Sequence, residues 1–391
     1  MDSKGETRDD MMLLGLSEPL ALLVARRFAA AKNAGSLVFS QTEVTSLQSS
    51  TVPPLDEAAL SILSLYADVD WQFQLRYCPA LAVKPTNNSP LQPASTAASL
   101  PAKPKKVDPF ENPHTDLLVA QIPASDPTHI LVLNKFPVIP NHFILATKVF
   151  KPQTHLLEAD DLHAAFACLK EWEKPTGELR GDENVQAAKQ RKRLFAFFNS
   201  GEHSGASQPH RHLQFLPVED MHQADDVANW QPLIDGGNHA EEKDNSEQLQ
   251  QPKLPFVTYT APLSPNPTPE ELHRSYLSLY AMAVTAAAQH SESLLNGISA
   301  SRALGTEGEA AISYNLAMTT SKMMICPRRS EHAWLPLEPE MKKGLVDEGL
   351  VKLNGTILAG TLMVKAEAEW NTLRQQPSML ENVLSSVGIP T

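Results

Sequence analysis

The sequence predicts an α+β fold with a large, mainly antiparallel sheet flanked by helices. Two observations lead to this fold class. Apolar runs typical of strands follow one another at 116–147, with only short proline-containing turns between them, which is the pattern of an antiparallel meander. Apolar residues with helical spacing occupy separate segments, as at 158–173. Grouped strands and separate helices favour α+β organisation.

The elements before position 85 are predicted from capping residues and apolar runs. Residues 1–16 are expected to be disordered. A helix follows, with Pro19 just inside its start, and it ends at Gly35. The run 36–44 predicts a strand, and the run 76–84 predicts a further extended segment.

The rest of the chain supplies most of the sheet and the helices that flank it. The predicted helix 158–173 carries an apolar stripe that includes Leu162, Phe166 and Leu169. We expect the last strand to complete the large sheet. The predicted strands are 116–122, 129–136, 142–147, 193–200, 210–218, 256–263, 311–320, 322–330 and 360–365, and the other predicted helices are 270–294, 366–375 and 378–387.

Two polar stretches interrupt this pattern and are predicted to be surface insertions. Residues 85–107 are rich in Pro, Ser, Ala, Asn and Lys, and residues 219–252 are acidic and rich in Gln and Asn. Without them the chain forms a single predicted domain, 17–388. Its N-terminal part, 17–218, carries the candidate catalytic motif, and its C-terminal part is 253–388.

Composition excludes several classes of protein. The net charge of −12 argues against nonspecific nucleic-acid binding, and it means that a polyphosphate would need local cations. Three separated cysteines indicate a reducing compartment rather than a disulfide framework. No apolar run is long enough for a membrane span, and Glu18 and Pro19 break the only candidate signal peptide. We expect a cytoplasmic protein, with the nucleus as an alternative.

The candidate chemistry lies in the stretch GEHSGASQPHRHLQFLP, residues 201–217. His210, His212 and Gln214 alternate, so in an extended strand they share one face. The preceding GASQP, residues 205–209, is small and flexible, and its N–H groups can turn toward an anion. Imidazole beside an anion cradle indicates nucleophilic attack on phosphorus.

The same histidines have other interpretations. An alternating pair can be half of a metal site or two partly exposed strand residues. Glutamine at the third position is unusual on a buried face unless it binds something. Adding His203 suggests a metal site, but no further ligand at zinc-like spacing is evident, so we predict no protein-bound metal. A divalent cation, Mg²⁺ in the first place, would instead arrive with substrate phosphates.

Three stretches together show a resemblance to a known family. They are LNKFPVIPNHFIL at 133–145, FNSGEHSGASQPHRHLQFLP at 198–217 and LNGTILAGTLMVK at 353–365. The chain resembles the histidine-triad superfamily in its nucleotidyltransferase branch, where glutamine replaces the third histidine. More narrowly it resembles the fungal-type ATP adenylyltransferases, also called diadenosine tetraphosphate phosphorylases. The resemblance implies a histidine-triad-like fold for residues 17–388.

The resemblance also assigns roles to residues. It makes His212 the nucleophile, His210 a structural residue that fixes the tautomer of its neighbour, and Gln214 a ligand of the adenylyl intermediate. Apart from the resemblance, the adjacent Arg328 and Arg329 are expected in a surface turn rather than in an anion clamp. The implied substrate-binding residues are Lys84, Asn134, Lys135, Asn199, Gly205, Ala206, Ser207, Gln208, Gln214, Asn354, Gly355, Thr356, Thr361 and Lys365.

The resemblance implies reversible phosphorolysis of diadenosine tetraphosphate to ATP and ADP through an adenylyl–histidine intermediate, with adenylyl sulfate as a further donor. A carboxamide at 214 cannot act as a general acid or base near neutrality, which favours transfer to phosphate over hydrolysis. The alternatives are a dinucleoside polyphosphate hydrolase, an inactive nucleotide-binding sensor and, more distantly, a metal-storing or scaffold protein. The expected partners are small nucleotides and phosphate, and we expect a monomer.

Overall fold

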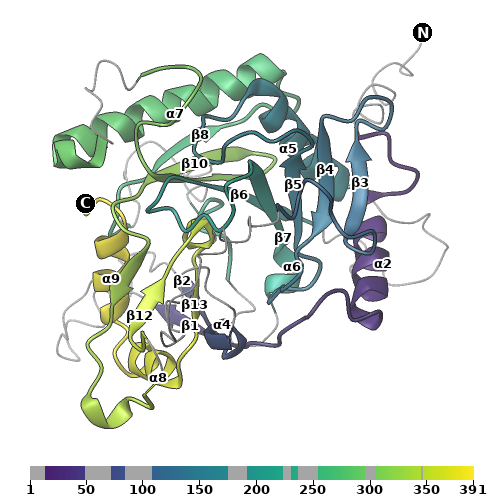
Figure 1. Ribbon diagram of the computed structural model, residues 1–391. Helices are drawn as coiled ribbons and strands as arrows, with labels where there is room; N and C mark the ends of the chain where they lie inside the picture. The colour runs from purple at the N-terminus through teal and green to yellow at the C-terminus, as the bar shows by residue number, and fades with distance from the viewer. Residues whose placement is uncertain are drawn as a thin grey trace, which may run out of the picture.

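Eight antiparallel strands form the central sheet of the computed structural model, in the order β3-β4-β5-β7-β6-β9-β10-β8 (Figure 1). The candidate strand β7 therefore lies inside the sheet, between β5 and β6. The strands are β3 Leu118–Ile122, β4 His129–Leu133, β5 Phe143–Thr147, β6 Leu194–Ser200, β7 His212–Pro217, β8 Tyr259–Pro262, β9 Tyr314–Met318 and β10 Lys322–Pro327. The structure describes residues 14–48, 72–83, 108–174, 192–222, 230–236, 254–295, 304–344 and 347–391.

Three helices cover one face of this sheet. They are α2 Leu20–Asn33, α5 Ala159–Trp172 and α7 Pro269–His290 (Figure 1). Their apolar stripes pack on sheet residues such as Leu145, Phe198 and Phe215 in the largest buried cluster. Removing this apolar area from water stabilises the fold at roughly 25 cal/mol per Å².

The other face of the sheet is divided between two smaller apolar clusters. Over β6, β9 and β10, Phe197 and Met324 pack against a three-stranded sheet and the C-terminal helices. Over β4 and β5, Ile130 and Ala146 pack against Phe110. His212 pairs with Ala146 and Gln214 with Ile144, which places both on this divided face. The candidate site therefore lies where the two clusters meet.

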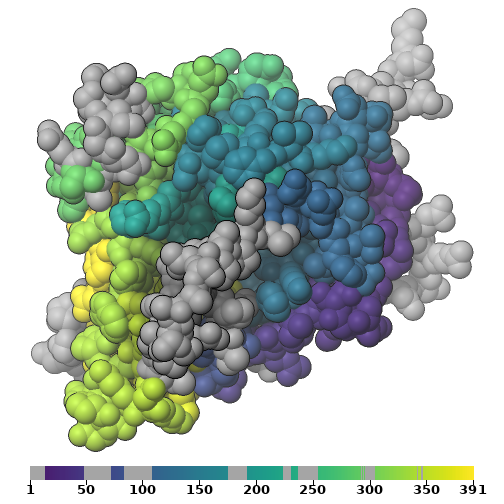
Figure 2. All heavy atoms as spheres, in the orientation of Figure 1, coloured from purple at the N-terminus to yellow at the C-terminus, as the bar shows by residue number. Residues whose placement is uncertain are grey.

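The three-stranded sheet has the order β1-β2-β13, in which β13 runs parallel to β2. Its strand β13 and the helices α8 and α9 belong to the C-terminal part of the chain, which is yellow-green to yellow in Figure 2, whereas β1 and β2 come from the purple to blue N-terminal part. The elements are β1 Glu43–Gln48, β2 Gln72–Tyr77, α4 Ala80–Val83, α6 Val218–Met221, η3 Glu292–Leu295, β11 His332–Trp334, η4 Pro339–Met341, β12 Leu350–Lys352, η5 Gly355–Ala359, β13 Thr361–Val364, α8 Glu367–Gln375 and α9 Met379–Val387.

Several predictions about the elements are wrong. The strand expected at 36–44 begins only at Glu43, and the extended segment 76–84 turns into the short helix α4. The last strand, β13, joins the three-stranded sheet because it pairs with β2 rather than with the large sheet. Leu14, in the stretch expected to be disordered, is buried in the main core.

The described parts of 219–252 are not a surface insertion. Met221, Trp230 and Ile234 are buried, and the Ile234 N–H donates to the carbonyl of Leu358 at 3.2 Å. The mainly polar composition of this stretch hides these few apolar anchors. The predicted insertion 85–107 lies outside the described residues. The division into parts 17–218 and 253–388 stays a prediction.

Candidate active site

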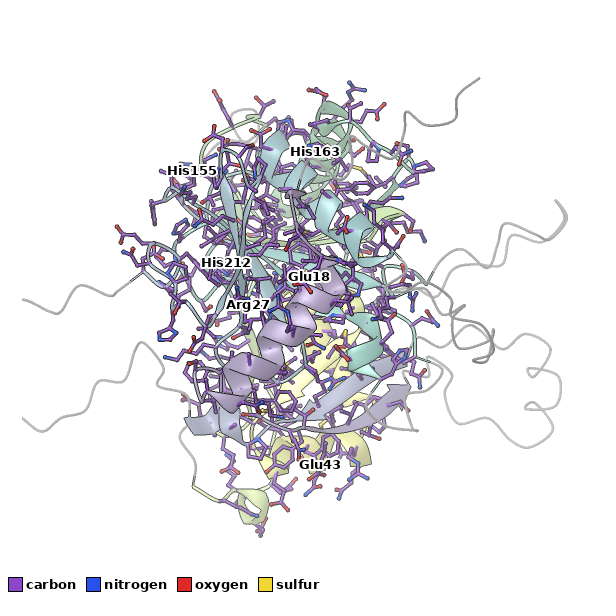
Figure 3. The ribbon with its side chains drawn as sticks, turned by 90° about the vertical axis from the view of Figure 1, so that its right-hand side faces the viewer. Glu18, Arg27, Glu43, His155, His163 and His212 are labelled. Atoms are coloured by element: carbon purple, nitrogen blue, oxygen red, sulfur yellow. The ribbon has the colours of Figure 1, made fainter. Side chains whose placement is uncertain are left out.

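The candidate nucleophile His212 is the first residue of β7 and is 3% exposed. Its ring Nδ1 donates to the carbonyl oxygen of His210 at 2.7 Å, so the proton of the neutral ring sits on Nδ1 and the lone pair on Nε2. Within the described ranges no group hydrogen-bonds to that Nε2. Figure 3 shows His212 at mid-height of the sheet. This ring can present a nucleophilic nitrogen to a ligand.

Burial lowers the pKa of His212 to about 4, and the neighbouring His210 adds to this effect, although the hydrogen bond to the His210 carbonyl opposes it. The ring of Phe110 lies against the imidazole, with 5.1 Å between the ring centroids. The apolar contact removes water from one side of the ring. The imidazole therefore stays neutral at physiological pH, and the neutral form is the nucleophilic one.

This lowered pKa predicts a loss of stability in acid. The folded protein binds a proton at His212 only near its lowered pKa of about 4, whereas the unfolded chain binds it near the ordinary histidine pKa of 6.5. The contribution of His212 to the free energy of unfolding is thus complete above pH 6.5 and is lost as pH falls toward 4. We expect the unfolding free energy of the wild type, relative to His212→Asn, to fall by about 2–3 kcal/mol between pH 7 and pH 4.5. Urea denaturation of both proteins across this range measures it, and a constant difference would contradict the prediction.

His210 precedes β7 and is held by an isolated bridge to Pro152, so the expected single strand face does not extend to it. Its Nε2 lies 2.8 Å from the carbonyl oxygen of Thr147, and its Nδ1 lies 2.7 Å from Asp108 Oδ2. Both ring nitrogens therefore have partners. His210 acts on its neighbour through its backbone carbonyl, while its ring anchors the turn.

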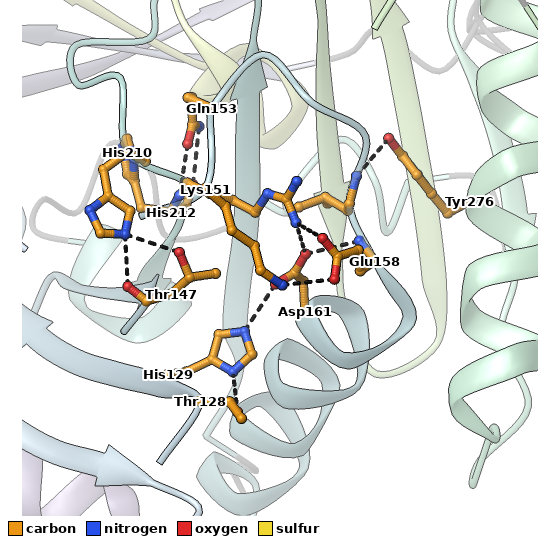
Figure 4. A network of polar contacts seen from close by, with 12 residues as sticks. Thr128, His129, Thr147, Lys151, Gln153, Glu158, Asp161, His210, His212 and Tyr276 are labelled. Atoms are coloured by element: carbon orange, nitrogen blue, oxygen red, sulfur yellow. Dashed lines mark hydrogen bonds and ion pairs between the residues drawn. The ribbon is translucent and has the colours of Figure 1, made fainter. Parts of the chain in front are cut away.

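Gln153 clamps the backbone of His212, as Figure 4 shows. Its Oε1 accepts from the His212 N–H at 2.7 Å, and its Nε2 donates to the His212 carbonyl at 3.2 Å. The same Nε2 also donates to the carbonyl of Asn199 on β6 at 2.7 Å. This buried amide replaces the ladder hydrogen bonds that are missing where β7 begins, and it fixes the nucleophile's peptide.

Gln214 is half-buried and is linked to Asn134 through a third residue. His142, which directly precedes β5, lies with its Nε2 3.1 Å from Gln214 Oε1 and its Nδ1 3.0 Å from Asn134 Nδ2. The predicted substrate residues Asn134 and Gln214 are thus brought together, although 80 positions separate them in the chain. Lys135, beside Asn134, is exposed, and its ammonium lies 5.6 Å from the centroid of the Phe136 ring.

The glycine-rich loop packs against the C-terminal motif. A Cβ at Gly205, where φ is +80°, would lie 2.7 Å from the Leu353 carbonyl oxygen and from Asn354 Cβ, so only glycine fits. Asn199 Oδ1 accepts from the Gly355 N–H at 2.9 Å. Asn199 Nδ2 is buried and has no hydrogen-bond partner in the described chain. This unused donor suits a ligand oxygen.

The other predicted substrate residues differ in accessibility. Ala206 and Ser207 are exposed, and Gln208 and Lys365 are half-buried. Thr356 and Thr361 use their hydroxyls inside the protein, the first to the Thr361 carbonyl at 3.0 Å and the second to Gln74 Oε1 at 3.4 Å. Lys84 lies outside the described residues.

Arg328 is buried rather than part of a surface turn, so that expectation is wrong. Its guanidinium donates to Asn315 Oδ1 and to the carbonyls of Ser330, Leu353 and Val387. Asn315 in turn donates to Asn199 Oδ1 at 2.9 Å. Arg328 therefore holds the C-terminal motif in place beside the site.

Sequence reasoning missed the residues that support the site. Asp108, Phe110, His142, Gln153 and Asn315 contact His210, His212, Gln214 or Asn199. His142 lies within the motif 133–145, which was the one available signal. The others come from distant segments with no local pattern. Across the described positions, no group of three or more His, Cys, Asp or Glu residues is arranged to hold a metal ion.

Fold and site together define a histidine-triad-like protein of the branch in which glutamine follows the two histidines. Residues 38–177 and 179–234 match the Ap4A phosphorylase N-terminal domain, and residues 252–390 match the ATP adenylyltransferase C-terminal domain. The chain belongs to this family of nucleotidyltransferases, as the sequence predicts.

Relatives and solved structures agree with the family. The chain is 28% identical over 326 residues to diadenosine 5',5'''-P1,P4-tetraphosphate phosphorylase 2 of Saccharomyces cerevisiae, which is 82% of this chain and 84% of the relative. It is 26% identical over 381 residues to Protein APA1 of the same yeast, 96% of each chain. The crystal structure of yeast Ap4A phosphorylase Apa2 superposes with a TM-score of 0.65 at 24% identity, covering 96% of this chain and 99% of that one, which confirms the predicted α+β fold. Its complex with Ap4A gives a TM-score of 0.61, also at 24% identity and with the same coverage.

None of the helices in the described segments has the length and apolar content needed to cross a membrane.

Proposed function

We propose that this enzyme catalyses the reversible phosphorolysis of diadenosine tetraphosphate, giving ATP and ADP. The observation that carries the proposal is the state of His212, a buried neutral imidazole whose Nδ1 is tied to a carbonyl and whose Nε2 has no protein partner in the described chain. Support also comes from the relative named as a diadenosine tetraphosphate phosphorylase and from the similar structure crystallised with Ap4A.

The proposed reaction has two in-line displacements. First, His212 Nε2 attacks the α-phosphorus of one adenylyl group, a P–N bond forms, and the P–O bond to the remaining chain breaks, so that ATP leaves. Second, an oxygen of inorganic phosphate attacks the same phosphorus, the P–N bond breaks, and ADP leaves. Covalent catalysis thus divides one difficult transfer into two easier steps. Adenylyl sulfate is proposed as a further donor, because the first step needs only an adenylyl group with a good leaving group.

The substrate-binding residues would hold the phosphate chain and the adenylyl group. Lys135, Lys365 and Lys84 supply cations in a protein of net charge −12, and each charge-assisted contact contributes roughly 1.5–3 kcal/mol. Asn199 Nδ2, which has no hydrogen-bond partner in the described chain, and the N–H groups of the loop 205–208 would donate to phosphate oxygens. We propose that Mg²⁺ enters with the phosphates. The three cysteines are buried free thiols, which suits the proposed cytoplasmic or nuclear location.

Phosphate dependence tests this function. With the dinucleotide and labelled phosphate, we expect ATP and labelled ADP in equal amounts. Without phosphate, we expect release of at most one ATP per enzyme, because the adenylyl group remains on the protein. Sustained production of AMP and ATP without phosphate would identify a hydrolase instead, and binding without turnover would identify a nucleotide sensor.

A further inference from the structure

We infer that His142 is a positioning residue that turns the Gln214 carboxamide so that its NH₂ group, and not its oxygen, faces the substrate. The inference rests on the proposed function, because it concerns how Gln214 holds the phosphate that is transferred. His142 is 7% exposed and lies between Asn134 and Gln214. Its own carbonyl accepts from the Asn134 N–H at 3.0 Å, so the two backbones are fixed relative to each other.

The direction of this hydrogen-bond chain is set at a backbone group. The N–H of Phe136 donates to Asn134 Oδ1 at 3.0 Å. A backbone N–H can only donate, so the oxygen of the Asn134 amide must face Phe136, and its NH₂ must face His142. The Asn134 amide then donates to His142 Nδ1 at 3.0 Å.

The same logic continues to Gln214. Because His142 Nδ1 accepts, the proton of the neutral ring is on Nε2, and Nε2 donates across 3.1 Å to Gln214 Oε1. The carboxamide oxygen is thereby occupied by His142. Within the described chain, Gln214 Nε2 makes no hydrogen bond. Each hydrogen bond from Phe136 to Gln214 thus has a defined donor and acceptor. The series ends at the Gln214 NH₂ group, whose two N–H donors are unused within the described residues.

This polarity matters for the chemistry. Phosphate oxygens are anionic acceptors, so an NH₂ group stabilises them and a carboxamide oxygen repels them. An amide that is free to flip would also present an acceptor that can orient water against the adenylyl group. His142 therefore favours phosphate binding and disfavours hydrolysis through one hydrogen bond. A glutamine at 214 has a defined orientation only with such a partner.

A double-mutant cycle tests the inference. We expect His142→Phe, which keeps a buried ring and loses the donor, to lower the rate of the ATP burst by about 10- to 100-fold. The ratio of AMP to ADP formed in the presence of phosphate should rise. In the Gln214→Ala background, the same His142→Phe change should cost less than about twofold, because the amide it orients is gone. His142→Gln, which can accept from Asn134 and donate to Gln214, should restore most of the rate.

Nitrogen NMR of the ¹⁵N-histidine-labelled wild type reports the tautomer of His142 without any measurement of activity. We expect His142 to carry its proton on Nε2, assigned as the signal lost in His142→Gln. A proton on Nδ1, a His142→Phe rate equal to that of the wild type, or an equal loss in the Gln214→Ala background would overturn the inference. A wild-type enzyme that forms no adenylyl adduct would instead refute the proposed function, so the two failures are distinguishable.

Discussion

Replacing His212 by alanine is expected to abolish the covalent adenylyl adduct and to lower kcat for phosphorolysis by about 10⁴- to 10⁶-fold, the range found when a covalent nucleophile is removed. The physical reason is the state of this ring: it is neutral, with a pKa of about 4, and its Nδ1 is bonded to the His210 carbonyl. Alanine leaves no group at this position that can bond to phosphorus. Intact-mass measurement after incubation with the dinucleotide and no phosphate checks the result.

Two features make this experiment specific. The wild type should gain the mass of one adenylyl group, and added phosphate should remove it with release of ADP. His332→Ala, a change at an exposed histidine of β11, should form the adduct like the wild type. Nucleotide binding by His212→Ala should persist, since Asn199, Gln214 and the lysines remain. An adduct on His212→Ala would assign the nucleophile to another residue.

Replacing Asp161 by asparagine is expected to lower the free energy of unfolding by about 3–5 kcal/mol. Arg211 directly precedes β7, is 2% exposed, and donates to Asp161 Oδ2 at 2.7 Å. Asp161 is fully buried, and its Oδ1 also pairs with His129 Nε2 at 3.0 Å (Figure 4). Burial alone would raise the pKa of Asp161, but the His129 hydrogen bond and the Arg211 charge lower it overall. A neutral partner would leave the buried Arg211 charge poorly compensated.

A matched control is available on the same arginine. Glu158 accepts from Arg211 Nη1 at 2.8 Å, but its side chain is 51% exposed. Because water screens such a pair, Glu158→Gln is expected to cost less than about 1 kcal/mol. Urea denaturation with an unchanged m-value measures both variants. Equal costs for the two substitutions would show that burial of the Asp161 pair is not what stabilises β7.

The strands of the large sheet could be predicted because a local pattern of apolar residues in the sequence marks each of them. Strands can be recognised in the meander 116–147 and in the runs around Phe198 and Phe215 from their own apolar residues. This recognition requires no knowledge of the strands with which they pair. The strand 361–364 was misplaced for the opposite reason. Its residues show that it is a strand, but its partner β2 was chosen by packing between segments nearly 290 positions apart.

The candidate site divides in the same way. The alternation of His212 with Gln214 follows from strand geometry and could be predicted, as could the small residues of the loop before it. His210 was expected in the same strand, but β7 starts only at His212, because Gln153 rather than a neighbouring strand satisfies the nucleophile's peptide. The spacing of residues in the sequence does not predict the hydrogen bonds from Gln153 to the backbone of His212.

By itself the sequence determined which groups are available for chemistry: an imidazole pair, a carboxamide in place of a third imidazole, a glycine-rich approach and lysines in an acidic chain. Only the tertiary structure decided their states. The proton of His212 is on Nδ1 because a carbonyl faces it, the ring is neutral because burial removes water, and the Gln214 amide points one way because His142 holds its oxygen. Residue identity is local information, whereas protonation and orientation depend on neighbours that only folding brings within hydrogen-bonding distance.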